Sequence, residues 1–137
     1  MMKLKSKAGA MLLTAVMIGT VATTPVQAAS NVSGNINGTN CYGSISYVFA
    51  PGGACNGVLA KTTYGQGGGT LSVTAKVFYQ TKSGKKTSSA SNYASGSGTS
   101  AIARNNDNGN VYGGKGTHKV SAGAYTWEKN TQIGTTW

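Results

Sequence analysis

Acid–base chemistry in this chain would depend on very few ionisable side chains. The 137 residues include only two acids, Asp107 and Glu128, and one histidine, His118. Glu128 and His118, together with Arg104, are the residue types that a small ribonuclease uses to move protons and to stabilise a phosphate. His118 stands between Thr117 and Lys119, however, which favours an exposed strand position. A ribonuclease-like hydrolase is therefore a distant third hypothesis, and we expect a protein that is not an enzyme.

Nucleophile, metal and cofactor chemistry lack the sequence context that they require. No serine stands in a Gly-x-Ser-x-Gly turn. The stretch 105–110 (NNDNGN) holds one carboxylate among neutral amides, which is too little for calcium, and zinc would need more ligands than the two cysteines and His118 supply. We predict no catalytic residue, no metal site and no cofactor.

The two cysteines, Cys41 and Cys55, are separated widely enough to argue against a redox pair. In an extracellular compartment an even number of cysteines is expected to oxidise. A bond between them would close a 15-residue ring, worth roughly 3 kcal/mol in the chain-entropy treatment. The sequence thus predicts a structural disulfide.

Cations and tyrosines are the best candidates for binding. Lys82, Lys85 and Lys86 surround Ser83 and Gly84, which suit a tight turn, so the three ammonium groups are expected at one hairpin tip. Ordinary solubility and protection of a sheet edge also explain these lysines. Four tyrosines in Gly- or Ser-rich surroundings are expected to be exposed, where their rings could meet sugars or a protein: Tyr42, Tyr64, Tyr93 and Tyr112. Trp127 is expected in the core, and Trp137 either seals one end of the fold or protrudes.

The elements that must position these side chains are short strands. Alternation is clearest from Thr70 to Tyr79, where the odd-numbered residues share an apolar face and Phe78 is an apolar exception on the wet face. A second strand places Cys41, Ile45 and Phe49 on one face, and the preceding Asn37–Gly38 predicts a two-residue hairpin turn. Further strands are expected at 32–36, 58–64, 86–93, 99–104, 117–121, 124–127 and 132–137. Residues 88–100 could equally be a loop or a wet edge strand.

This pattern predicts an all-β fold, either a small antiparallel β-sandwich or a small barrel. The first 28 residues predict a cleaved secretory signal peptide: three lysines precede an uncharged apolar run, and small residues precede cleavage after Ala28 or Ala29. Residues 29–137 then form a single disulfide-stapled domain. We expect it to be secreted and extracellular, without a transmembrane anchor, and at most loosely associated with the cell wall.

The charge of the exported part indicates its partners. It retains nine of the twelve basic residues and both acids, a formal charge of about +7 that attracts polyanions over long range. We expect a non-catalytic interaction module that binds anionic cell-envelope polymers, glycans or a protein surface, with no dedicated nucleic-acid site. The alternative is a small secreted antimicrobial protein, a bacteriocin-like toxin.

Overall fold

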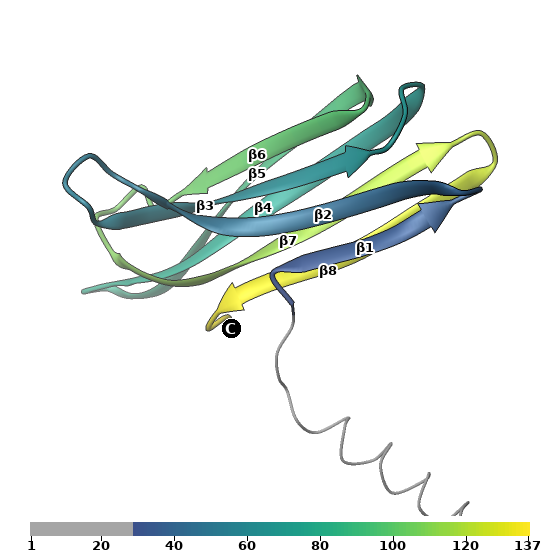
Figure 1. Cartoon of the computed structure of the whole chain (residues 1–137). Coiled ribbons are helices and arrows are strands. Elements are labelled where there is room, and N and C mark those ends of the chain that lie inside the picture. The colour runs from purple at the N-terminus through teal and green to yellow at the C-terminus, as the bar shows by residue number, and fades with distance from the viewer. Residues whose placement is uncertain (1–28) are drawn as a thin grey trace, which may run out of the picture.

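The protein is an all-β molecule of two antiparallel sheets. The computed structural model describes residues 29–137 (Figure 1), and the expected signal peptide, residues 1–28, lies outside them. The strands are β1 (Asn31–Ile36), β2 (Thr39–Phe49), β3 (Cys55–Tyr64), β4 (Gly69–Thr81), β5 (Gly84–Gly96), β6 (Gly98–Arg104), β7 (Asn110–Ala122) and β8 (Tyr125–Gly134). They form one sheet with the order β1-β2-β3-β6 and another with the order β5-β4-β7-β8. The sheets lie face to face, so the fold is a sandwich rather than a barrel.

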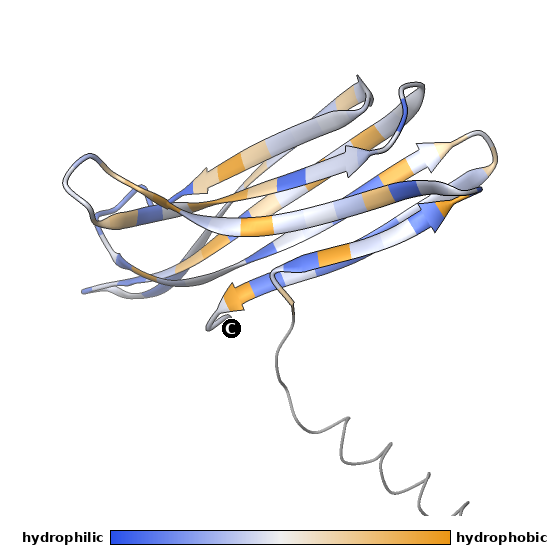
Figure 2. Ribbon diagram, viewed as in Figure 1, coloured by the Kyte–Doolittle hydropathy of each residue, from blue (hydrophilic) through white to orange (hydrophobic). Residues whose placement is uncertain are grey.

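Alternating side chains fill the space between the sheets. Leu71, Val73, Ala75 and Val77 of β4 are all buried, as the sequence predicted, and Figure 2 shows apolar and polar bands alternating along the strands. Each fully buried valine or leucine stabilises the fold by about 1.5–3 kcal/mol. Within the part of the chain that the structure describes, no helix is long and apolar enough to cross a membrane.

The apolar core has two parts. The larger cluster includes Val58, Val73 and Val77 and lies towards the ends of β2 and β4. The smaller cluster includes Leu71 and Trp127 and lies beside the turn between β7 and β8. Trp127 is 7% exposed, which confirms its predicted place in the core. The two clusters leave room between them for a polar layer, described below.

The first hairpin has the turn that the sequence predicted. Ile36 pairs with Thr39, so Asn37 and Gly38 alone connect β1 to β2. Both have positive φ angles, 49° and 86°, the backbone twist that a two-residue hairpin requires and that asparagine and glycine tolerate best. The side chain of Asn35 accepts a hydrogen bond from the Gly38 amide, 2.6 Å away.

The sheets approach each other at both edges of the sandwich. Along one edge, the amide of Asn92 in β5 donates a hydrogen bond to the Ser100 carbonyl of β6, 3.0 Å away. Along the other, the indole of Trp127 lies directly on Gly34 of β1, where a side chain would overlap it. The edge strands are therefore partly covered, which limits strand pairing between molecules.

The predicted disulfide is wrong, because β2 and β3 form one long hairpin. Cys41 pairs with Tyr64 at one end of this hairpin, whereas Cys55 pairs with Phe49 at the other. Eight residues of extended chain separate the two positions, or about 26 Å, and a disulfide needs Cα atoms within about 7 Å. Both cysteines are free thiols, with Cys41 buried.

Two segments differ from the predicted elements in detail. Residues 88–100, expected as a loop or as a wet edge strand, mostly belong to the edge strand β5, which continues to Gly96 before a single-residue connection to β6. The two short strands expected at 124–127 and 132–137 are instead one strand, β8, followed by a tail that ends at Trp137. Asn105–Gly109 is a connecting loop, as its composition indicated.

Candidate functional site: the basic face

The outer face of the sheet β5-β4-β7-β8 carries most of the features that could bind a ligand. We call it the basic face, because it presents four lysines: Lys76, Lys85, Lys115 and Lys119. Its other side chains are mainly Ser, Thr, Asn and Gln from all four strands. Glu128 is its one carboxylate, directly opposite Lys119 across β7 and β8. The result is a polar surface with a net positive charge.

A shallow hollow lies near one end of this face. In one row across the sheet, Ser72 of β4 stands between Tyr93 of β5 and Lys119 of β7. The next row adds the hydroxyls of Thr70 and Ser121, and the five residues line a hollow of about 280 Å³. Tyr93 is 68% exposed, so its ring is free to stack while the ammonium and hydroxyls offer hydrogen bonds.

A pair of like charges lies farther along the face. Lys76 and Lys115 are directly opposite each other on β4 and β7, an arrangement that costs stability unless an anion lies between the ammonium groups. Their Nζ atoms lie 6.0 and 5.7 Å from the ring centroid of Phe78. Lys115 and Lys119 are four residues apart on β7, so their positions are separated by about 13 Å along the strand. Among the described residues, none of these lysines forms an ion pair.

Phe78 is the apolar exception that the sequence placed on the wet face, and the C-terminal tail covers it. Trp137 packs edge-on against its ring, with centroids 5.7 Å apart and an interplanar angle of 88°. Phe78 is consequently only 2% exposed, whereas Trp137 remains 40% exposed. Trp137 thus both seals an apolar residue and presents part of its own ring beside Tyr112, 6.0 Å away.

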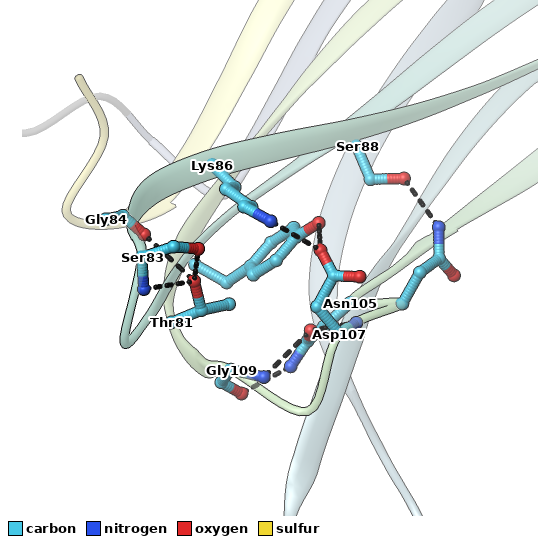
Figure 3. A network of polar contacts seen from close by, with 10 residues as sticks. Thr81, Ser83, Gly84, Lys86, Ser88, Asn105, Asp107 and Gly109 are labelled. Atoms are coloured by element: carbon cyan, nitrogen blue, oxygen red, sulfur yellow. Dashed lines mark hydrogen bonds and ion pairs between the residues drawn. The ribbon is translucent and has the colours of Figure 1, made fainter.

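The three lysines predicted at one hairpin tip diverge. Thr81 pairs with Gly84, so Lys82 and Ser83 form the turn. Lys85 turns to the basic face, 5.0 Å from the ring of Trp137. Lys86 turns the other way and forms an ion pair with Asp107 at 3.3 Å, within the network shown in Figure 3. A single three-cation anion site at this tip is therefore not assembled.

The four predicted tyrosines also separate. Tyr93 and Tyr112 are exposed on the same sheet as the lysines, at 68% and 44%. Tyr42 is exposed on the opposite sheet, where its hydroxyl donates a hydrogen bond to Asn31, 2.7 Å away. The prediction for Tyr64 is wrong: it is 4% exposed, because its register opposite Cys41 turns the ring into the smaller core cluster.

His118 is likewise buried rather than at the surface, and it forms the centre of a polar layer between the two core clusters. Its Nδ1 lies 2.9 Å from Oγ1 of Thr62, and its Nε2 lies 2.8 Å from Oγ1 of Thr131. Cβ atoms on Gly43 or Gly116 would come within 2.5 and 2.8 Å of the imidazole. Burial lowers the pKa of His118 to about 4, against a smaller raising effect of the Lys61 backbone. The ring is therefore neutral near pH 7.

The ribonuclease-like trio does not converge. His118 faces the core, whereas Glu128 is exposed on the outer side of the same sheet. Arg104 ends β6 in the other sheet, where it donates a hydrogen bond to Asn56 at 3.2 Å. Within residues 29–137, no group of three His, Cys, Asp or Glu side chains could hold a metal ion.

Another hollow, of about 510 Å³, lies at the end of the sandwich near the loops 50–54 and 105–109. Its polar lining consists mainly of the neutral amides of Asn56, Asn105, Asn108 and Asn110, with the thiol of Cys55 as its ionisable side chain. Amides can bind by hydrogen bonds but cannot exchange protons near neutral pH. This hollow lacks the paired acid and base of a hydrolytic centre.

Sequence reasoning missed Lys76, Lys115 and Lys119 as neighbours. The alternation from Thr70 to Tyr79 predicts that Lys76 points outward. The same period of two in β7 places Lys115 and Lys119 on the face opposite to Gly116, His118 and Val120. The missing information was the pairing of β4 with β7, two strands that are not consecutive in the chain.

Comparison with protein-family models, with curated proteins and with solved structures finds no match for this chain. The geometry of the basic face consequently gives the main indication of function.

Proposed function

We propose that this protein is a secreted, non-catalytic interaction module that binds an anionic glycan polymer of a cell envelope through its basic face. The observation that carries the proposal is the hollow on that face, where the exposed ring of Tyr93 stands beside Lys119 and three hydroxyl groups. An aromatic ring can stack on a sugar ring, and hydroxyls and an ammonium group can bind its oxygens and an acidic substituent.

The lysine pair extends this binding surface for a polymer. An extended anionic chain lying along β7 would meet Lys119 first and the pair Lys76 and Lys115 about 13 Å later. A phosphate or carboxylate between the paired lysines would relieve their mutual repulsion. Neither Lys76 nor Lys115 forms an ion pair among the described residues, which leaves the charges of the pair free for a ligand.

The experiment compares two double variants that lower the net charge equally. Lys76→Gln/Lys115→Gln removes the pair on the basic face, whereas Lys61→Gln/Lys129→Gln removes two charges elsewhere, one of them on the opposite sheet. Co-sedimentation with isolated Gram-positive cell walls is measured as salt is raised, because salt screens non-specific attraction most strongly. The proposal expects a selective loss for the first variant.

Tyr93→Ala tests the hollow in the same assay. The proposal expects weaker retention at high salt, where stacking and hydrogen bonds persist after screening. Equal losses in both double variants, together with unchanged binding by Tyr93→Ala, would reduce the interaction to net charge and refute a dedicated face.

A further inference from the structure

One end of the sandwich gathers exposed aromatic side chains that the basic face does not explain. Tyr47, Phe49, Tyr112 and Trp137 are 37%, 60%, 44% and 40% exposed. We call this region, with the loop 50–54, the aromatic end. Figure 1 shows the β2–β3 loop, the β4–β5 turn, the β6–β7 loop and the C-terminus towards the same end of the two sheets.

The aromatic side chains form two neighbouring pairs. The rings of Tyr47 and Phe49 are 6.5 Å apart, and those of Tyr112 and Trp137 are 6.0 Å apart. Gly134 lies between the pairs, because a Cβ added to it would overlap both the hydroxyl of Tyr47 and the carbonyl of Tyr112. Tyrosine and tryptophan with one apolar and one wet side are typical of the boundary between membrane and water.

The loop that follows Phe49 is suited to entering that boundary. Residues 49–54 read FAPGGA and carry no charged side chain. The loop also satisfies part of its own backbone, since Ala50 donates to the Ala54 carbonyl and Gly53 donates to the Ala50 carbonyl, each at 2.8 Å. Because fewer of its backbone groups lack a hydrogen-bond partner, the loop can move from water into the interfacial region of a bilayer at a lower free-energy cost.

The charge near this end favours an anionic surface. Lys82 lies in the β4–β5 turn, and Lys85 stands 5.0 Å from the ring of Trp137. The nearby carboxylate of Asp107 is already engaged by Lys86 at 3.3 Å and by the hydroxyl of Tyr79 at 3.1 Å. Cations beside interfacial aromatic rings attract anionic lipid headgroups and place the rings at the boundary.

We propose that the aromatic end docks reversibly on the surface of an anionic lipid bilayer, with Phe49 and Trp137 inserted at the interface and Lys82 and Lys85 at the headgroups. The uncharged loop together with flanking cations distinguishes this partner from a protein surface. The inference does not rest on polymer binding, because the hollow and the lysine pair at Lys76 and Lys115 take no part in it, and Lys85 is the one lysine of the basic face that it uses.

The test measures co-sedimentation of the purified protein with vesicles of phosphatidylcholine, with and without phosphatidylglycerol. Phe49→Ser/Trp137→Ser should weaken binding to the anionic vesicles about tenfold or more, from the lost burial of two rings. Lys82→Gln/Lys85→Gln should abolish the preference for phosphatidylglycerol. The matched control is Ile102→Ser, which removes an apolar side chain with 41% exposure, close to the 40% of Trp137, from β6 at the edge of the other sheet.

Tryptophan fluorescence gives a local readout. Trp137 is 40% exposed at the aromatic end and Trp127 is 7% exposed in the core, so a blue shift on adding anionic vesicles should disappear in Trp137→Phe. All variants share whatever residues precede Ala29 in the purified protein, so differences among them report on the aromatic end.

Unchanged vesicle binding by Phe49→Ser/Trp137→Ser, or an equal loss in Ile102→Ser, would overturn the proposal. So would the absence of a fluorescence shift at low salt. Binding of a protein from the envelope in place of vesicles, lost in the same aromatic variant, would assign this end to a protein partner instead. Far-ultraviolet circular dichroism of each variant verifies that the sandwich is intact.

Discussion

Acidification should destabilise this protein through one buried imidazole. His118 is fully buried, and desolvation lowers its pKa from 6.5 to about 4 in the folded state. The unfolded chain therefore binds a proton more readily, and stability that is fully present above pH 6.5 is lost as the pH falls towards 4. The pKa of His118 differs by about 2.5 between the unfolded and folded states. At about 1.36 kcal/mol for each pKa unit, the free energy of unfolding falls by roughly 3 kcal/mol, which is a large fraction of the stability of a small domain.

Urea unfolding followed by tryptophan fluorescence, to which the buried Trp127 and the half-exposed Trp137 both contribute, measures this loss. The free energy of unfolding should fall by roughly 3 kcal/mol between pH 7.5 and pH 4, with the slope confined to this interval. His118→Gln keeps an uncharged polar group at the site and should flatten the slope, whatever its effect on stability at neutral pH. A wild-type curve that is flat over this range, or a variant with the same slope, would refute the assignment to His118.

Three further predictions concern the fold. A thiol reagent should modify Cys55 in the native protein but Cys41 only after unfolding, because burial shields Cys41 and raises the pKa of its thiol; mass spectrometry identifies the site, and a reductant should leave the melting temperature unchanged. Gly43→Ala places a Cβ 2.5 Å from Cγ of His118 and should lower the free energy of unfolding by about 1–3 kcal/mol. The control Gly52→Ala, whose Cβ would have no atom within 4 Å, should change it by less than about 0.5 kcal/mol. Chemical denaturation of the two variants and the wild type measures the difference. Gly38→Ala at φ +86° should destabilise the first hairpin by about 1 kcal/mol in the same measurement.

Local patterns in the sequence predicted the strands well. The alternation from Thr70 to Tyr79 identified the buried face of β4 and the wet position of Phe78, and Asn37–Gly38 identified a turn, because both features depend on neighbouring residues alone. The errors arose where the answer depended on pairing at a distance. The thirteen residues between Cys41 and Cys55 could close a small ring or belong to two long strands, and only the register of β2 with β3 distinguishes the two arrangements.

The environment of His118 shows a second limit. Gly114, Gly116 and Val120 share its face of β7, so the period of two could have indicated an inward imidazole. The two hydroxyl partners could not be found in this way, because Thr62 belongs to the other sheet and Thr131 to the next strand. The basic face could not be predicted for the same reason, because its rows of side chains form only when β4 pairs with β5 and β7.

The polar layer around His118 also determines how the two sheets can be aligned. Valines and alanines make up most of the larger cluster, and side chains so similar in shape would pack almost as well there after one sheet slid past the other by two residues. The imidazole would then lose the hydroxyl of Thr62, and a buried polar atom without a partner costs roughly 1–3 kcal/mol. Gly43 and Gly116 provide the space for the ring at one position only. The histidine thus acts as an alignment pin: together with Trp127 on Gly34, it favours one alignment of the two sheets over the others.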